Sequence, residues 1–572
     1  MPNKLLLDVR DLEVSFKMKG GDIHAVSNVS FNLNKGETLG IVGESGSGKS
    51  VTALSIMNLI ASPPGNISSG KILFKEAKKE TDLLALNENK LQKYRGNRIA
   101  MIFQEPMTSL NPVYSCGKQI AESLMIHQGI NAVEAKKRTI ALFREVKLPK
   151  PETIFNSYPH QISGGQKQRV MIAMAISCNP DILIADEPTT ALDVTVQKSI
   201  LDLLKSLQKK HGMSIIFITH DLGVVAEIAD RILVMYQGKI VEEEKTQKLF
   251  SNPQHPYTKG LIACRPRTDI KLKRLPTIDD FVDSESQKSI NQFIEELAKK
   301  PGENNFSLEN PILELQNLKT YFPINTNFFG KTKSWVKAVD EVSLKVFPGE
   351  TLGLVGESGC GKTTLGRSIL YLTAPSSGDV FFKDQNLGLM NTNQLQAVRK
   401  KMQIIFQDPY SSLNPRKMVG EAIMEPMKVH ALFKTEKTRK EKTIDLLHKT
   451  GLESDYFYRY PHELSGGQRQ RICIARALGL NPEFIICDES VSALDVSIQA
   501  QILNLLNDLK EEFKLTYIFI SHDLSVVKYM SDRMAVMKDG KIIEIDLADE
   551  IYNNPKTEYT QKLIDAIPNI KI

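Results

Sequence analysis

An apolar run, residues 39–42, leads directly into Gly43-Glu44-Ser45-Gly46-Ser47-Gly48-Lys49-Ser50, and a helical pattern follows over 51–57. The stretch fits the phosphate-binding pattern G-x-x-x-x-G-K-[ST] in the strand–loop–helix setting that this pattern requires. Glycines let backbone N–H groups converge on phosphate oxygens, and the start of a helix adds partial positive charge. We expect Lys49 to reach the outer phosphates and the Ser50 hydroxyl to bind Mg²⁺. The stretch therefore predicts that the chain binds a nucleoside triphosphate.

The same pattern occurs a second time, as Gly356-Glu357-Ser358-Gly359-Cys360-Gly361-Lys362-Thr363. Another stretch, Ser163-Gly164-Gly165-Gln166, returns 302 residues further on as Ser465-Gly466-Gly467-Gln468. Recurrence of several motifs at a nearly fixed distance indicates a duplicated architecture. We therefore divide the chain into a first half at 1–262, a linker at 263–310 and a second half at 311–572.

Length and composition bound the class of protein. A chain of 572 residues is too long for one core, and its 41% hydrophobic and 24% charged residues are ordinary for a globular protein. The net charge of +6 is small for this length and does not indicate a nucleic-acid partner. The six cysteines include no C-x-x-C pair, which fits reduced thiols in a cytosolic compartment. We expect no signal peptide and no membrane span, because no 18 apolar residues run together.

Each half also contains an apolar strand that ends in two adjacent acids, Asp186-Glu187 in the first half and Asp488-Glu489 in the second. Neighbouring carboxylates at the end of a buried strand are costly unless they serve a purpose there. We expect the aspartate to hold Mg²⁺ and the glutamate to polarise the attacking water as a general base.

Polar residues that end two other strands complete the candidate sites. Gln104 and Gln407 each follow a short apolar strand, and we expect their amides to contact Mg²⁺ and the attacking water. His220 and His522 each end another apolar strand, 34 residues after the aspartate of their half. A lone histidine in such a place is usually structural, but its repetition at the same distance favours a γ-phosphate sensor.

Two weaker signals occur in both halves. Phe16 and Phe322 hold equivalent places in the first strands, where each is expected to stack on an adenine ring; packing within the sheet is the alternative. The serine that opens each S-G-G-Q segment is expected to cap a helix whose N-terminus accepts a phosphate oxygen. An ordinary helix cap is the alternative interpretation for these serines.

Together the motifs resemble those of the ATP-binding-cassette (ABC) ATPases over nearly the whole chain. The resemblance implies an α/β fold with two tandem P-loop ABC nucleotide-binding domains arranged head to tail. Each would have a RecA-like mixed sheet core, an antiparallel β part and an α-helical subdomain. Asp193 and Asp495, in the repeated A-L-D, would be the D-loop aspartates. The departures from the family pattern, Ile162 and Ser490, remove no catalytic group.

In that family the S-G-G-Q segment of one half closes over the ATP held by the other half. The resemblance therefore implies two composite sites, each built from both halves. The first would join Lys49, Asp186, Glu187 and His220 to the S-G-G-Q segment of the second half, from Ser465 to Gln468. The second would join Lys362, Asp488, Glu489 and His522 to the S-G-G-Q segment of the first half, from Ser163 to Gln166.

Two kinds of segment look like those of importer ATPases for dipeptides, oligopeptides and nickel: those after the glutamines, 104–112 and 407–415, and those near the end of each half, 252–261 and 554–563. In that family two different ATPases drive one importer, and here the two look fused into one chain, as in the glutathione-type importers. This implies ATP and Mg²⁺ as cofactors, two membrane permease subunits and an external solute-binding protein as partners, and no nucleic acid. The chain would lie peripherally on the cytoplasmic face of the inner membrane, and the loops after Gln104 and Gln407 would contact the permeases. A soluble translation factor of the ABC-F kind is the alternative, although such factors usually carry a long helical linker. The solute itself, whether a peptide, glutathione, an opine or a nickel complex, is not specified.

The linker is expected to be a flexible coil over 266–310, long enough, at roughly 35–40 Å, for the halves to pair within one chain. Ile290, Phe293, Ile294 and Leu297 predict a short amphipathic helix that packs against one half. Cys264 is the only cysteine near the end of the first half, so we expect no iron–sulfur or zinc site.

Overall fold

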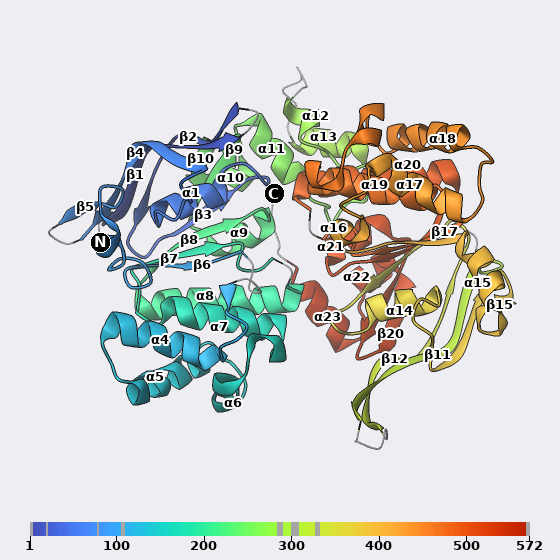
Figure 1. Ribbon diagram of the computed structural model, residues 1–572, viewed down its shortest axis with the longest axis horizontal. Coiled ribbons are helices and arrows are strands. Elements are labelled where there is room, and N and C mark those ends of the chain that lie inside the picture. The colour runs from blue at the N-terminus through green and yellow to red at the C-terminus, as the bar shows by residue number, and fades with distance from the viewer. Residues whose placement is uncertain are drawn as a thin grey trace.

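The computed structural model describes residues 4–18, 21–76, 79–104, 109–190, 192–282, 290–298, 308–326, 332–492 and 494–567. Figure 1 shows the first half (blue to green) and the second half (yellow to red) lying side by side. None of the helices in these ranges has both the length and the apolar character needed to cross a membrane.

A six-stranded sheet with the order β10-β9-β3-β8-β7-β6 forms the core of the first half. Its strands are β3 (Thr38–Val42), β6 (Ile99–Ile102), β7 (Ile182–Asp186), β8 (Ser214–Thr219), β9 (Arg231–Tyr236) and β10 (Lys239–Lys245). All are parallel except β10, which pairs antiparallel with β9. Every residue of β3, β7 and β8 is buried, as expected for parallel strands covered on both faces. This order brings the carboxyl ends of β3, β6, β7 and β8 to one edge, where the P-loop and the predicted catalytic residues follow them.

A second, antiparallel sheet and a group of helices complete this half. The sheet has the order β2-β1-β4-β5, formed by β1 (Leu5–Met18), β2 (Gly21–Asn34), β4 (Gly65–Lys75) and β5 (Glu80–Asp82). The helices are α1 (Lys49–Ile56), α2 (Glu88–Leu91), α4 (Cys116–Gln128), α5 (Ala132–Glu145), α6 (Pro151–Asn156), α7 (Gly164–Ile176), α8 (Val194–His211), α9 (Leu222–Ile228), α10 (Thr246–Ser251) and α11 (Pro256–Ala263). In Figure 1, α4 to α7 lie together on the far side of the core sheet from β1 and β2.

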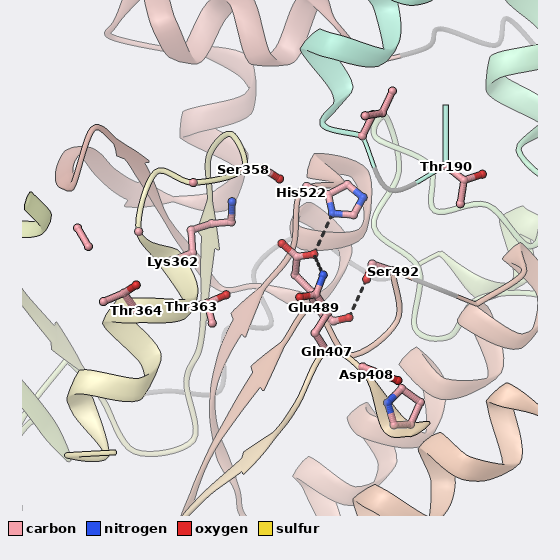
Figure 2. A pocket seen from close by; sticks show the side chains of 15 residues that line it. Thr190, Ser358, Lys362, Thr363, Thr364, Gln407, Asp408, Glu489, Ser492 and His522 are labelled. Atoms are coloured by element: carbon pink, nitrogen blue, oxygen red, sulfur yellow. Dashed lines mark hydrogen bonds and ion pairs between the residues drawn. The ribbon is translucent and has the colours of Figure 1, made fainter. Parts of the chain in front are cut away.

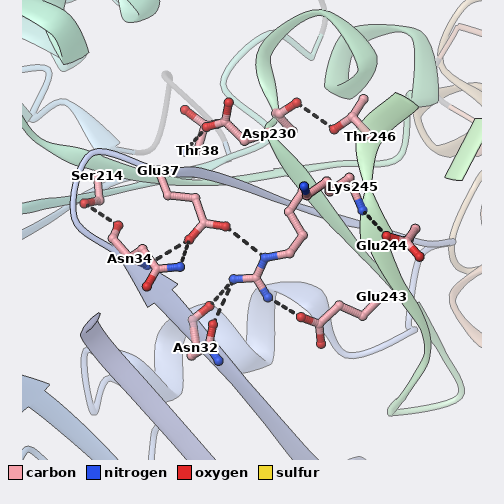
Figure 3. Close-up of polar contacts among 12 residues, drawn as sticks. Asn32, Asn34, Glu37, Thr38, Ser214, Asp230, Glu243, Glu244, Lys245 and Thr246 are labelled. Atoms are coloured by element: carbon pink, nitrogen blue, oxygen red, sulfur yellow. Dashed lines mark hydrogen bonds and ion pairs between the residues drawn. The ribbon is translucent and has the colours of Figure 1, made fainter. Parts of the chain in front are cut away.

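Arg231, at the start of β9, connects the two sheets through Glu37 and Asn32, which are labelled in Figure 3. Its Nε atom donates to Oε1 of Glu37 at 2.8 Å, and its Nη2 atom donates to the carbonyl oxygen of Asn32 on β2 at 2.7 Å. Glu37 in turn accepts from the backbone N–H of Asn34 at 2.8 Å. The second half repeats this tie with Arg533 and Glu350, 3.2 Å apart.

The second half repeats the whole arrangement. Its sheets have the orders β16-β17-β18-β13-β19-β20 and β12-β11-β14-β15. The strands are β11 (Leu313–Thr326), β12 (Thr332–Val346), β13 (Thr351–Val355), β14 (Ser377–Phe382), β15 (Gln385–Asn386), β16 (Met402–Ile405), β17 (Phe484–Asp488), β18 (Thr516–Ile520), β19 (Arg533–Lys538) and β20 (Lys541–Leu547). The helices are α14 (Lys362–Ile369), α15 (Thr392–Arg399), α16 (Pro409–Ser412), α17 (Val419–Val429), α18 (Glu436–Lys449), α19 (Gly466–Leu478), α20 (Val496–Phe513), α21 (Leu524–Met530), α22 (Ala548–Asn553) and α23 (Glu558–Asp565). The predicted fold class, two tandem α/β halves, is confirmed.

The linker is not a free coil over residues 265–282, which we call the linker strap. Its side chains Leu272, Leu275, Ile278 and Phe281 are buried in a core cluster that also contains residues of α11 and α20. The backbone of Leu275 is held on both sides by Asn504 of α20, with two hydrogen bonds of 2.8 Å. The expectation of a flexible coil is wrong here, because regularly spaced apolar side chains in this segment are buried between the two halves.

The predicted amphipathic helix in the linker is confirmed as α13 (Ile290–Leu297), which packs near α12 (Asp279–Val282). Ile290 and Ile294 are buried, and the ring centroids of Phe281 and Phe293 lie 5.2 Å apart. Residues 283–289 and 299–307 lie outside the described residues. The linker thus joins α11 of the first half to α20 of the second through packed contacts, in addition to the chain itself.

We expect Asn504→Leu to release the linker strap. The change leaves the backbone N–H and C=O of Leu275 without their partner, which costs about 1–3 kcal/mol for buried polar groups. Limited proteolysis of the native protein should then cut within 265–282 about tenfold faster or more, because cleavage follows the open population. Gln501→Leu, on the same helix, is the control, because the Gln501 amide accepts a hydrogen bond from Arg471 and not from Leu275. Equal cleavage of the two variants would contradict the docked strap.

Candidate functional site

The two P-loops wrap around a lysine in the same way. Lys49 Nζ donates to the carbonyl oxygens of Gly43 and Glu44, both at 2.7 Å. Lys362 Nζ makes the equivalent contacts to Gly356 at 2.6 Å and Glu357 at 3.0 Å. Both lysines are buried, and burial lowers the pKa of Lys49 while nearby acids, Asp495 first among them, oppose that change. Each amine therefore lies across its loop, where it can meet a phosphate.

Glycine is required at the last loop position before each helix. Gly48 has φ 101°, and a Cβ there would lie 2.5 Å from the carbonyl oxygen of Ala25. Gly361 has φ 110°, and a Cβ there would lie 1.9 Å from the carbonyl oxygen of Ala338. Within the described part of the chain no side chain caps α1 or α14, so the first N–H groups of both helices remain open to an anion.

A hydroxyl and a carboxylate meet just beyond each P-loop. Ser50 Oγ donates to Asp186 Oδ1 at 3.1 Å, and Thr363 Oγ1 donates to Asp488 Oδ1 at 3.0 Å. Burial raises the pKa of Asp186 to about 6, although the hydrogen bond from Ser50 acts in the opposite direction. A buried carboxylate beside a hydroxyl is a set of hard oxygen donors of the kind that Mg²⁺ accepts. The residues present therefore fit the predicted cation.

The carboxylate of Glu187 is surrounded by donors in the first site. Its Oε1 atom lies 3.0 Å from His220 Nδ1, and its Oε2 atom accepts from Gln104 Nε2 at 3.1 Å and Thr190 Oγ1 at 2.9 Å. Burial by itself would raise the pKa of Glu187, but the hydrogen bonds and charge of His220 and the hydrogen bond of Thr190 lower it to about 2. Glu187 has φ 48°, so the chain turns sharply after β7. The structure thus brings Gln104, Glu187 and His220 together, and adds Thr190.

The second site has the same members with a different arrangement of hydrogen bonds (Figure 2). Gln407 Nε2 donates to Glu489 Oε2 at 2.8 Å, and His522 Nδ1 lies 3.4 Å from the same oxygen. Burial would raise the pKa of Glu489, but His522 and then Lys362 lower it. A cavity of about 510 Å³ opens here and is lined by both halves. Its lining includes Leu192, Ser358, Lys362, Thr363 and His522.

Each half contacts the P-loop of the other through its predicted D-loop. Asp193 Oδ1 accepts from the backbone N–H of Ser358 at 2.6 Å, and Thr195 Oγ1 donates to Glu357 Oε1 at 3.0 Å. In the reverse direction, Ser497 lies beside Glu44 of the first P-loop: burial raises the pKa of Glu44, and the Ser497 hydroxyl lowers it. The halves are therefore arranged head to tail. Sequence reasoning missed Thr195 and Ser497, although both follow the repeated A-L-D by two residues.

The S-G-G-Q segments cap helices as predicted, at the surface. Ser163 opens α7 and Ser465 opens α19, each in a reciprocal capping box with the glutamine three residues later. Both serines are exposed, and the described residues that line the 510 Å³ cavity include none of residues 163–166. Closure of each segment over the opposite P-loop stays a prediction.

The two phenylalanines have different surroundings. Phe16 is partly buried and packs beside Gly65, whose Cβ position lies 3.0 Å from the Phe16 ring. Phe322 is 42% exposed on the long hairpin of β11 and β12. Neither position tests the predicted adenine contact, which stays a prediction for both. Cys360 is buried in the second P-loop with its Sγ atom 3.9 Å from Lys362 Nζ, and burial raises the pKa of its thiol.

One tyrosine near the end of each half also reaches the P-loop of that half. The backbone N–H of Glu44 donates to the Tyr257 hydroxyl at 3.0 Å, and that of Glu357 donates to the Tyr559 hydroxyl at 3.1 Å. Tyr257 is fully buried and its ring stacks near Tyr236 at 4.2 Å. Sequence reasoning quoted both tyrosines only as part of a resemblance, although a tyrosine at the same place in both halves was a usable signal.

Comparison with known proteins matches both the repeated core and the segments that follow it. Residues 26–190 and 339–492 match the family described as ABC transporter, and residues 241–290 and 543–572 match the oligopeptide/dipeptide transporter C-terminal region. The chain is 47% identical over 570 residues to the glutathione import ATP-binding protein of Pectobacterium atrosepticum, covering 99% of this chain and 90% of the relative. It is 48% identical over 565 residues to that of Escherichia coli K12, covering 98% and 89%, and 47% identical over 576 residues to that of Salmonella paratyphi A, covering 99% and 91%.

Proposed function

The chain belongs to the ABC transporter family, and we propose that it is the ATP-hydrolysing subunit that drives a solute importer. The observation that carries this proposal is the presence of two sets of P-loop, acid pair, glutamine and histidine, each facing the D-loop of the other half. A translation factor of the ABC-F kind is not favoured, because the relatives are named as import proteins and both halves end in an oligopeptide/dipeptide transporter region.

Equivalent residues have the same role at both sites in the proposed reaction. Lys49 and Lys362 bind the outer phosphates of ATP, and the Ser50–Asp186 and Thr363–Asp488 pairs hold Mg²⁺. The cation, when bound, supplies positive charge to the phosphates. Glu187 and Glu489 accept the proton of the attacking water. His220 and His522 hold these carboxylates and face the γ-phosphate, as their contacts with the glutamates support.

Gln104 and Gln407 connect hydrolysis to the permeases in this proposal. Each amide donates to the glutamate of its site, and must leave that carboxylate in order to contact Mg²⁺. A cavity of about 770 Å³ begins at Gln407 and extends along α17 to Val429. Val429, which lines this cavity, is 63% exposed, and Tyr410, in the loop that follows Gln407, is 55% exposed. Residues 105–108 of the corresponding first-half loop lie outside the described residues.

The solute and the partners follow from the relatives. The relatives are named for glutathione import, and the matched C-terminal region is named for oligopeptides and dipeptides, so we infer a small peptide of the glutathione type as solute. Two membrane permease subunits and an external solute-binding protein complete the importer. The chain itself would lie on the cytoplasmic face of the inner membrane, bound through the surface around Gln104 and Gln407.

A charge at the 770 Å³ cavity tests this proposal. We expect Val429→Glu to reduce uptake of labelled glutathione by cells at least tenfold, because a permease that docks here has to bury an unpaired carboxylate. ATP binding by the purified variant should stay unchanged. Leu389→Glu is the control, since Leu389 is 85% exposed and lies outside that cavity. Loss of ATP binding in Val429→Glu would make the cavity a structural feature, and unchanged uptake would place the permeases elsewhere.

A further inference from the structure

We propose that Thr190 is a positioning residue that restrains the base of the first site, so that the two ATP sites hydrolyse at different rates and the first is slower. The inference rests on the proposed function, because it takes Glu187 and Glu489 to be the proton acceptors. It concerns the direction of one hydroxyl group, which differs between two otherwise equivalent turns.

The backbone of the two turns is the same. Glu187 and Glu489 have φ values of 48° and 47°. The backbone N–H of Thr190 donates to the carbonyl oxygen of Glu187 at 3.3 Å, and that of Ser492 donates to the carbonyl oxygen of Glu489 at 3.2 Å. The strands before these turns and the histidines beside them also correspond. A difference between the sites therefore has to come from side chains.

The hydroxyl groups point to different acceptors. Thr190 Oγ1 donates to the side-chain Oε2 of Glu187 at 2.9 Å, whereas Ser492 Oγ donates to the backbone oxygen of Glu489 at 2.9 Å (Figure 2). Threonine is restricted about χ1 by its methyl group, while serine rotates more freely. The Thr190 hydroxyl thus binds the carboxylate of Glu187, whereas the Ser492 hydroxyl binds the backbone of the turn.

The carboxylates of Glu187 and Glu489 therefore accept different numbers of hydrogen bonds from side chains. Both oxygens of Glu187 accept from side chains, Oε1 from His220 and Oε2 from Gln104 and Thr190. Among the described residues, both side-chain contacts of Glu489, from Gln407 and His522, fall on Oε2. An attacking water has to donate to one of these oxygens, so it competes with more donors at Glu187.

Basicity acts in the same direction. Every hydrogen bond donated to a carboxylate favours its charged form and makes it a weaker base. Side chains donate three such hydrogen bonds to the Glu187 carboxylate, from His220, Gln104 and Thr190. Ser492 adds none to the Glu489 carboxylate, because its hydroxyl donates to the backbone oxygen of that residue. Competition and weaker basicity both predict slower proton transfer at the first site.

Hydrolysis by the full-length chain tests the proposal, with one site silenced at a time. Single-turnover assays give the rate of the chemical step, and steady-state assays give KM for ATP. In a Glu489→Gln background only the first site hydrolyses, and we expect Thr190→Val to raise its rate about two- to fivefold without changing KM for ATP. In a Glu187→Gln background we expect Ser492→Thr to slow the second site by a similar factor. Thr189→Val is the control, because it makes the same change one residue away and valine already stands at the matching position, Val491.

The outcomes separate the inference from the function on which it rests. A first site that keeps its rate or slows in Thr190→Val overturns the inference, as does a second site that keeps its rate in Ser492→Thr. A KM that changes together with the rate also overturns it, because the hydroxyl would then act on ATP binding. Normal hydrolysis by Glu187→Gln would remove the proposed base itself, and the inference with it.

Discussion

Replacing Glu187 or Glu489 by glutamine slows ATP hydrolysis at the altered site by about 10²–10⁴, the usual contribution of a positioned general base. The amide keeps the size of the side chain but cannot accept the proton of the attacking water. ATP binding is expected to persist, because Lys49, Lys362 and the open helix N-termini are untouched. Rapid-quench assays of bound, labelled ATP measure the chemical step apart from product release.

Glu511→Gln provides the control for these variants, since Glu511 is exposed on α20. The double variant Glu187→Gln with Glu489→Gln should bind ATP and hydrolyse almost none. Unchanged hydrolysis in one single variant would mean that its site does not hydrolyse ATP in the native protein. Loss of ATP binding would instead assign a structural role to that glutamate, through its contacts with Gln104 or Gln407.

The second large effect is expected from crossed double variants. Lys49→Ala together with Ser163→Arg should abolish hydrolysis, because these residues belong to opposite composite sites. Lys49→Ala together with Ser465→Arg should be little worse than either single variant, because both changes fall in one site. The head-to-tail contacts support this pattern, because the D-loop of the first half is hydrogen-bonded to the P-loop of the second.

Steady-state ATPase assays on the three single and two double variants measure this pattern. Each arginine variant is first tested for helix integrity by circular dichroism, because Ser163 and Ser465 cap α7 and α19. If Lys49→Ala with Ser163→Arg retains the activity of a single variant, each half works alone and the composite sites are wrong. Additive loss in the same-site pair would contradict them equally.

Features that depend on neighbours along the chain could be predicted from the amino-acid sequence. A P-loop is one short segment whose glycine φ values and helix start are set locally, so Gly48 and Lys49 were identifiable from pattern alone. The apolar strands that lead to Asp186-Glu187 and to His220 could also be predicted, because a buried parallel strand is a continuous apolar run in the sequence. The repeat then supplied the two-half architecture and the correspondence between the two sites.

Contacts between groups that are far apart along the chain became known from the folded structure. Asp193 contacts Ser358 and Leu275 contacts Asn504 at separations of 165 and 229 residues, which no local pattern encodes. The linker composition suggested a coil, but its apolar side chains are buried because two folded halves offer them a surface. The direction of the Thr190 and Ser492 hydroxyls was equally out of reach, since it depends on which acceptor the folded turn places within about 3 Å.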